Sequence, residues 1–219
     1  MDNSPYILKE TENYAVVYKP PKMHCVPIKK NNTGTLLDWY NGHIMHRLDY
    51  ETHGLVLFAK NDKSYEYFKD LQDRGEFVKE YSAICVRSDS LLETVFPFTI
   101  ESYFRPFGPG RKLVRPVTDE TKTKKEIVKD KGGFYCTEII SLDGNVFTVR
   151  IKRGFRHQIR CHLSWIGCPI LNDPLYPDPV SLPPENYLAL RAHAVFFKDP
   201  ADGGEKESRI LKMSDYVVK

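Results

Sequence analysis

Residues 46–60 read HRLDYETHGLVLFAK, and this stretch decides the expected fold. Its second half, residues 55–59, is an uninterrupted apolar run and predicts a buried strand. Just before that run stands one aspartate, Asp49, with Arg47 two positions ahead of it. Loops at strand ends are where rigid scaffolds present reactive groups. An arginine and an aspartate beside a turn are more often a surface ion pair or a turn former, so this stretch alone leaves both interpretations open.

A second stretch gathers basic and polar side chains into one expected helix. Residues 154–176 read GFRHQIRCHLSWIGCPILNDPLY. A helix over residues 156–166 would place three apolar side chains on one face: Ile159, Leu163 and Ile166. Arg160 follows Ile159 directly, so we expect its side chain near the buried face of this helix.

Together the two stretches resemble the RluA-type family of pseudouridine synthases. That family carries an HRLD-x-x-T-S-G-L-x-L-F-A-K segment, a later K-x-Y segment, and an H-Q-I-R-x-H segment followed by G-x-P-I-x-G-D-P-x-Y. The chain matches them at residues 46–60, 79–81 and 157–176. Residues 7–22 and 188–197 also look like the family's opening stretch and final core strand, so the resemblance covers nearly the whole chain. One departure is His53, a titratable group where the family usually has serine.

The resemblance implies an α+β pseudouridine synthase fold, a bent, mixed but mainly antiparallel sheet with flanking helices. We expect a single catalytic domain over residues 1–219, with no separate N-terminal RNA-binding domain. The implied activity is isomerisation of specific uridines to pseudouridine in structured RNA, either rRNA or tRNA. The reaction breaks the bond from C1′ to N1 and rejoins C1′ to C5. A carboxylate suffices as the covalent or proton-handling group, so no cofactor is expected.

The family's site residues map onto particular positions of this chain. Asp49 becomes the catalytic carboxylate, and Arg160 becomes its ion-pair partner, with a phosphate contact as the alternative for Arg160. Tyr81 would lie against the flipped uracil, although an ordinary core tyrosine is also compatible with its place in a strand. Arg47 would fill the gap that the extruded base leaves. We expect structural hydrogen-bonding roles for three histidines: His46, His157 and His162.

Basic residues are concentrated in residues 103–131. This segment holds nine basic and four acidic residues, a balance of +5, so the remainder carries −2 of the net charge of +3. Its aromatic, proline and glycine residues suit a mobile loop that tracks phosphates and stacks on unpaired bases. A solvated insertion is the alternative. The residues expected to bind RNA are Arg47, Lys79, Arg105, Arg111, Lys112, Arg115 and Arg156.

Composition is compatible with a compact enzyme. At 219 residues and 41% hydrophobic content, the chain can bury a sizeable core. No apolar run approaches the roughly 20 residues of a membrane helix. The N-terminus lacks a basic region followed by an apolar stretch, so we expect no signal peptide and a cytoplasmic protein. Five cysteines without a C-x-x-C pair predict reduced thiols, several of them buried, and no metal site. We expect a monomer.

Two other classes of function compete with this interpretation. A non-catalytic RNA-binding module would explain the basic segment but gives no reason for HRLD and HQIR to occur together. A metal-dependent hydrolase could use His43, His46 and His53 with nearby carboxylates. His43 and His46 are a possible ligand pair at i, i+3, but this pattern is weak without a clear third ligand.

Local patterns predict the elements that carry these motifs. Strands are expected at residues 14–18, 55–59, 77–86, 134–140, 146–151, 192–197 and 208–212. Helices are expected at residues 35–40, from a cap at Asn61 or Asp62 onward, and at residues 156–166. Asp143 and Gly144 predict a hairpin turn, because both turn positions tolerate positive φ. A loop is expected at residues 199–205.

Overall fold

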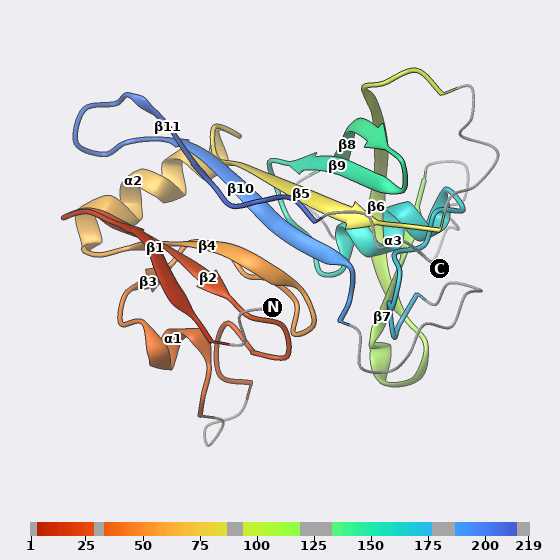
Figure 1. The fold of residues 1–219 in the computed structure, drawn as a ribbon, viewed down its shortest axis with the longest axis horizontal. Helices are drawn as coiled ribbons and strands as arrows, with labels where there is room; N and C mark the ends of the chain where they lie inside the picture. The colour runs from red at the N-terminus through yellow and green to blue at the C-terminus, as the bar shows by residue number, and fades with distance from the viewer. Residues whose placement is uncertain (1–3, 29–32, 87–93, 119–132, 177–186, 214–219) are drawn as a thin grey trace. The chain divides into compact units, whose positions relative to one another are not determined.

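The fold comes from a computed structural model that describes residues 4–28, 33–86, 94–118, 133–176 and 187–213 (Figure 1). Contacts divide the chain into two compact units. Unit 1 comprises Met1–Ser82 and Leu190–Met213, and unit 2 comprises Ala83–Ala189 and Ser214–Lys219. The single catalytic domain over residues 1–219 stays a prediction.

The sheet of unit 1 is mixed and mainly antiparallel, as predicted. Its strands follow the order β1 (Tyr6–Glu10), β2 (Tyr14–Lys19), β4 (His53–Ala59), β10 (Leu190–Lys198) and β5 (Val78–Ile84). β3 (His43–Ile44) pairs with β4, and β11 (Glu205–Arg209) pairs with β10. β4 is parallel to β10 but antiparallel to β2 and β3. All seven residues of β4 are buried, which confirms the buried strand predicted at residues 55–59; the strand begins two residues earlier than predicted.

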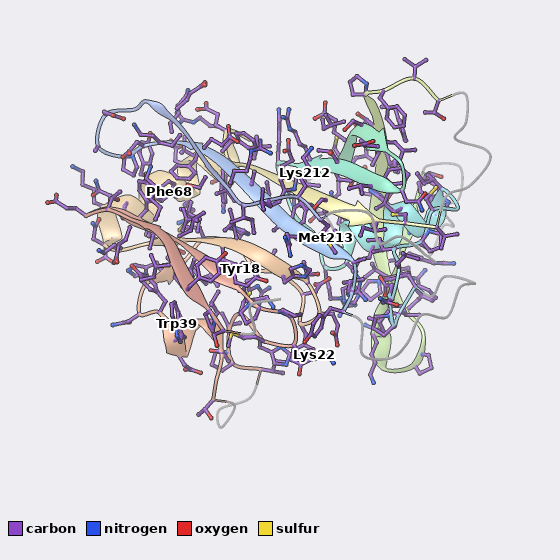
Figure 2. All side chains as sticks on the ribbon, viewed as in Figure 1. Tyr18, Lys22, Trp39, Phe68, Lys212 and Met213 are labelled. Atoms are coloured by element: carbon purple, nitrogen blue, oxygen red, sulfur yellow. The ribbon has the colours of Figure 1, made fainter. Side chains whose placement is uncertain are left out.

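Helix α2 (Asp62–Asp73) covers part of one face of this sheet. Asn61 caps it, since its side chain accepts a hydrogen bond from the Ser64 N–H at 2.9 Å. Its residues Phe68 and Leu71 are fully buried in a cluster with β2, β4 and β10 (Figure 2). The short helix α1 (Leu36–Trp39) begins at a capping box on Thr35. Both helices confirm the sequence prediction.

The strands of unit 2 follow the order β9 (Val146–Ile151), β8 (Tyr135–Asp143), β6 (Phe98–Phe107) and β7 (Leu113–Val117). β8 and β9 form the predicted hairpin, with Gly144 at φ +57° in its turn. A short 3-10 helix, η2 (Pro109–Arg111), joins β6 to β7, and helix α3 (Gln158–Trp165) follows β9. The side chains of Gln158 and His162 tie α3 to β6 and β8.

Three sequence predictions need correction. Residues 103–117 are not a loop, because β6 and β7 pair antiparallel from Tyr103 with Val117 to Phe107 with Leu113. The rest of the predicted loop, residues 119–131, lies outside the described residues. α3 starts two residues later than predicted, since His157 adopts φ +56°. The last strand is Glu205–Arg209 and not residues 208–212, because its backbone pairs with β10 over that range.

The tryptophans, the cysteines and the apolar character of the helices complete the description. The two tryptophans lie one in each unit. Trp39 is in α1 at 44% exposure (Figure 2), and Trp165 is at the end of α3 at 48%. The five cysteines are free thiols, and all except Cys136 are buried. Within the described ranges, no helix has the length and apolar character needed to cross a membrane.

Candidate active site

Asp49 lies in the loop that connects β3 to β4 in unit 1. The Met45 N–H donates to the Leu57 carbonyl at 2.9 Å, and the Leu57 N–H donates to His46 Nε2 at 3.2 Å. Hydrogen bonds that join Met45 and His46 to Leu57, in the middle of β4, therefore fix the start of the loop. A turn follows the aspartate, where the Thr52 N–H donates to the Asp49 carbonyl at 3.2 Å. The predicted position of Asp49, at the mouth of a buried strand, is confirmed.

Two side chains hold the backbone on either side of Asp49. The Leu48 N–H donates to Cys25 Sγ at 3.2 Å, and the Cys25 thiol donates to the Leu48 carbonyl at 3.5 Å. On the other side, Lys19 Nζ donates to the Tyr50 carbonyl at 3.3 Å. The neighbours of Asp49 are thus fixed, while its own side chain is half-buried.

Lys19 is a completely buried cation at the end of β2. Besides Tyr50 it donates to the carbonyls of Pro20 at 2.9 Å and Met23 at 2.7 Å. Burial lowers the pKa of Lys19 to about 8, while the acidic groups around it, Cys25, Asp49 and Glu51, oppose that shift. Sequence reasoning missed Lys19. The available signal was a lysine in an otherwise apolar strand, since a buried ammonium requires several acceptors.

Tyr81 of β5 lies within electrostatic range of Asp49. The tyrosine is 5% exposed, and its pKa is raised first by burial and then by the negative charge of Asp49. Lys79 of the same strand is also 5% exposed, and burial lowers its pKa to about 8. Its Nζ lies 4.7 Å from the centre of the Phe77 ring. The predicted RNA contact of Lys79 stays a prediction, and its burial does not favour it.

Two further residues of the HRLD stretch differ sharply in exposure. Arg47 is exposed on the loop, as stacking in place of a base requires. His53 is completely buried, and burial, together with the charges of Arg191 and Lys19, lowers its pKa to about 3. His53 is therefore neutral across the physiological range, so the departure from serine adds no charge there at neutral pH.

Arg160 of α3 lies in unit 2, whereas Asp49 lies in unit 1. Arg160 is 2% exposed and forms a fork with Asp173, with Nε to Oδ2 and Nη2 to Oδ1 both at 2.7 Å. Asp173 Oδ1 also accepts the N–H groups of Leu175 at 2.8 Å and Tyr176 at 3.0 Å. Sequence reasoning placed Asp173 only in a turn. The pairing of Arg160 with Asp49 stays a prediction.

Two side chains of the HQIR-x-H segment have structural roles. Gln158 Nε2 donates to the Cys136 carbonyl at 2.9 Å and lies 3.0 Å from Thr137 Oγ1. His162 bridges Ser102 Oγ at 2.9 Å and Thr137 Oγ1 at 2.8 Å, and burial lowers its pKa to about 4. The structural role predicted for His162 is confirmed.

The hairpin of β6 and β7 brings most of the predicted RNA-binding residues together. Arg105 and Arg115 are register partners on its two strands, and both are exposed. The exposed Arg111 and Lys112 occupy the connection between the strands. Arg156 Nη2 donates to the Arg111 carbonyl at 2.7 Å, which fastens the start of α3 to the hairpin.

The histidines of the hydrolase alternative point to separate partners. His43 Nε2 lies 3.1 Å from Asp62 Oδ1, whereas His46 accepts from the Leu57 backbone. In the part of the chain that the structure describes, no three histidine, cysteine or carboxylate side chains gather as a group able to hold a metal ion.

Comparison with known protein families assigns the chain. The sequence model described as RNA pseudouridylate synthase matches residues 13–165. The chain belongs to the RluA-type family of RNA pseudouridine synthases. The matched region contains the Asp49 loop, Tyr81 and all of α3.

Known relatives agree with this family. The chain is 26% identical to the ribosomal large subunit pseudouridine synthase C of Rickettsia felis, covering 91% of this chain and 65% of that protein. It is 30% identical to an uncharacterized protein of Caenorhabditis elegans, covering 78% of this chain and 38% of that protein. The chain thus spans less than two thirds of either relative.

A solved structure shows the fold. Human RNA pseudouridylate synthase domain containing 1 superposes with a TM-score of 0.70 at 18% identity, covering 96% of this chain and 84% of that one. The pseudouridine synthase fold predicted from the sequence is confirmed.

Proposed function

We propose that this chain converts specific uridines of structured RNA to pseudouridine in the cytoplasm, with Asp49 as the catalytic carboxylate and without a cofactor. The observation that carries the proposal is the Asp49 loop, whose backbone is fixed by Cys25 and Lys19 on either side of the aspartate. Fixed backbone around a half-buried carboxylate preorganises a reactive group. The name of the Rickettsia felis relative supports rRNA as the substrate, with tRNA as the alternative.

The reaction asks one carboxylate to act at the ribose or at the base. The bond from C1′ to N1 breaks, the uracil rotates, C1′ bonds to C5, and the proton of C5 leaves while N1 gains one. Asp49 acts as nucleophile or as the group that handles these charges. The Lys19 ammonium supplies positive charge near the aspartate, and Arg160 supplies a second cation in the paired arrangement that we propose.

The base must leave the helix before it reacts, at a cost of a few kcal/mol. Tyr81 offers a buried aromatic face close to Asp49 for the flipped uracil. Arg47, exposed on the same loop, takes the place of the base in the RNA stack.

RNA binding is assigned to the hairpin of β6 and β7. Arg105 and Arg115 are register partners, and both are exposed. Exposed cations on paired strands concentrate positive charge where phosphates can approach, which supports RNA contact over a solvated insertion. The four exposed cations of the hairpin and Arg156 form one basic surface of unit 2.

The decisive experiment replaces Asp49 by asparagine. Asp49→Asn should abolish pseudouridine formation in RNA from cells lacking this gene, while RNA affinity stays within about one order of magnitude, because binding rests on phosphates. Asp73→Asn at the exposed end of α2 is the matched control and should keep activity. Turnover by Asp49→Asn close to that of the wild type would contradict the assignment of Asp49 as the catalytic carboxylate. A wild-type protein that binds RNA without forming product would instead favour the RNA-binding module.

A further inference from the structure

A histidine and a tyrosine form a ring stack directly beside Asp49. The ring centroids of His24 and Tyr50 lie 4.5 Å apart, with planes inclined at 37°. Tyr50 follows Asp49 in the chain, whereas His24 lies between β2 and α1. All three residues belong to unit 1. The two rings take no part in the chemistry proposed for Asp49, but an RNA that reaches this carboxylate comes close to them.

Hydrogen bonds fix the backbone that carries both rings. The Tyr50 carbonyl accepts from Lys19 Nζ at 3.3 Å. The His24 carbonyl accepts from the Leu36 N–H at 2.8 Å, at the first residue of α1. Two segments that are distant in the sequence therefore bring the rings together. A surface with a fixed backbone loses little conformational freedom when a ligand binds.

The stack leaves one aromatic ring at the protein surface. Tyr50 is 42% exposed, and His24 is half-buried. Other aromatic side chains of unit 1 are in the core, since Tyr14, Phe58 and Phe68 are completely buried. An exposed ring that is supported by a second ring offers its surface to a further planar group. Unpaired bases of RNA are such groups, because every base has a π face.

The charge around Tyr50 favours a base over a phosphate as the occupant. Two carboxylates flank the tyrosine in the chain, those of Asp49 and Glu51. Carboxylates repel a phosphate, whereas a base carries no charge. The exposed ring therefore fits the planar, uncharged part of a nucleotide.

We propose that the ring of Tyr50, supported by His24, stacks with the base of a nucleotide next to the target uridine. Consecutive Cα atoms lie about 3.8 Å apart, so Tyr50 is close enough to Asp49 to contact the nucleotide beside the one that reacts. A base held on Tyr50 fixes the RNA strand on one side of the extruded uridine. The inference rests on the proposed function in taking Asp49 as the group that acts on this uridine.

Binding to two strands of equal charge tests the stacking without turnover. One strand is a short oligouridylate, and the other is an abasic ribose phosphate of the same length. Both are titrated against Asp49→Asn and against the same protein with Tyr50→Ala added. Tyr50→Ala should weaken oligouridylate binding about tenfold and leave binding of the abasic strand unchanged, because only a base stacks. Equal weakening for both strands, or none for the oligouridylate, would overturn the proposal.

Two further variants separate the aromatic ring from the bulk of the side chain. Tyr50→Phe should keep the affinity for oligouridylate, whereas Tyr50→Leu should lower it about as much as Tyr50→Ala does. Tyr50→Leu keeps an apolar side chain, so it tests the stack even if Tyr50→Ala does not fold. An affinity of Tyr50→Leu equal to that of Tyr50→Phe would overturn the proposal.

The matched control is Tyr65→Ala. Tyr65 stacks on His43 with ring centroids 5.1 Å apart and planes also inclined at 37°. This pair lies at the opposite end of β4 from the Asp49 loop, since His43 is the register partner of Ala59. Tyr65→Ala should therefore leave oligouridylate binding unchanged.

Abasic nucleotides in a substrate test the position beside the target. The RNA that the wild type modifies is made with one abasic nucleotide, either before or after the target uridine. Tyr50→Ala should raise KM about tenfold with the intact RNA and have no further effect when the stacked nucleotide is abasic. An increase in KM that persists with both abasic RNAs would overturn the proposal. A wild type that makes no pseudouridine is instead a failure of the proposed function, and the oligouridylate titrations still test the stack.

Discussion

At the scale of single residues, the unusual group is the ammonium of Lys19. A lysine at 0% exposure is rare, and this one is accommodated by three backbone carbonyls, those of Pro20, Met23 and Tyr50. Two of these carbonyls flank the turn after β2, and the third belongs to the residue after Asp49. The buried charge therefore joins the end of one strand to the loop that presents the carboxylate.

Lys19→Met should change the pH dependence of stability in a defined direction. The pKa of Lys19 falls from 10.5 to about 8 on folding, so between these values the unfolded chain binds more protons. The free energy of unfolding should therefore rise with pH over that window, by at most about 1.4 kcal/mol per pH unit. Urea titrations of wild type and Lys19→Met from about pH 8 to about pH 10 measure this difference.

The matched control is Lys79→Met, which removes a second lysine that is buried among the described residues and whose pKa burial lowers to about 8. Each variant should show a shallower rise in stability with pH than the wild type, because each keeps one of these two lysines. We expect only Lys19→Met to lose turnover strongly, because Lys19 holds the Tyr50 carbonyl. The free energy of unfolding of the wild type minus that of Lys19→Met should increase with pH over this window. A difference that stays constant or decreases would contradict the assignment of a buried charge at Lys19.

At the scale of elements, the parallel pair of β4 and β10 depends on Gly54. This glycine has φ +124°, and a Cβ at this position would lie 2.2 Å from the Ala192 carbonyl oxygen. No side chain fits there without separating the strands. Because β4 begins directly after the Asp49 loop, the close approach also fixes where that loop ends.

Gly54→Ala should therefore destabilise the protein by about 2 kcal/mol or more, and activity should fall with it. The control is Gly203→Ala, at φ +68° with no atom within 4 Å of the added Cβ, which carries backbone strain without a clash. Chemical denaturation of both variants separates the free-energy cost of backbone strain from that of the steric clash with Ala192. Equal stability of the two variants would show that the strands tolerate the added methyl group.

The hairpin of β6 and β7 yields a prediction about RNA affinity. Neutralising Arg111, Lys112 and Arg115 together with glutamine should lower the salt slope of RNA binding by about two and raise the apparent KM. The variant should change KM far more than kcat. A control with three exposed lysines of unit 1 neutralised, Lys9, Lys63 and Lys69, should leave the slope unchanged. Unchanged binding by the hairpin variant would make this hairpin a solvated insertion.

Elements with a strong local pattern were predictable from the sequence. β4 is an apolar run, α2 has a cap and spaced apolar residues, and the turn at Gly144 carries its own conformational preference. β6 and β7 were missed because their exposed cations resemble a loop, and only pairing between distant residues makes them strands. The start of α3 depends on the tertiary bonds of Gln158, which no local pattern contains.

At the scale of the whole molecule, histidines whose pKa is lowered in the folded protein set the response to acid. The pKa values of His46, His53 and His162 are lowered by burial to about 3, 3 and 4, from an ordinary value of 6.5. Below pH 6.5 the unfolded chain takes up protons that the folded chain does not. Stability is therefore lost as pH falls, by up to about 1.4 kcal/mol per pH unit for each histidine.

Denaturant midpoints between about pH 7 and about pH 5 measure this loss. His53→Ser should make the decline shallower, because it removes a buried imidazole whose pKa is lowered to about 3. His43→Ser, at an exposed position, is the matched control and should leave the slope as in the wild type. A decline of the same steepness in His53→Ser would mean that this histidine is charged in the folded protein.

Residues of the candidate site were also predictable only where a short stretch of sequence identifies them. Three motifs predicted Asp49, Tyr81 and Arg160, since each carries its residue types within a short stretch. Lys19 and Asp173 were missed because their importance comes from carbonyls and a guanidinium that other segments supply. The reactive residues of such a site can be recognised from short motifs, whereas the residues that position them can be recognised only from contacts in the folded chain.

Because one tryptophan lies in each unit, intrinsic fluorescence can follow the unfolding of each unit separately. Trp39 and Trp165 are the only indoles, one in each unit, and each is about half exposed. Trp39→Phe leaves fluorescence that reports on unit 2, and Trp165→Phe leaves fluorescence that reports on unit 1. Coincident urea transitions of the two proteins would mean that the units melt as one cooperative body, as a single catalytic domain requires. Separate transitions would reveal two bodies that unfold in turn.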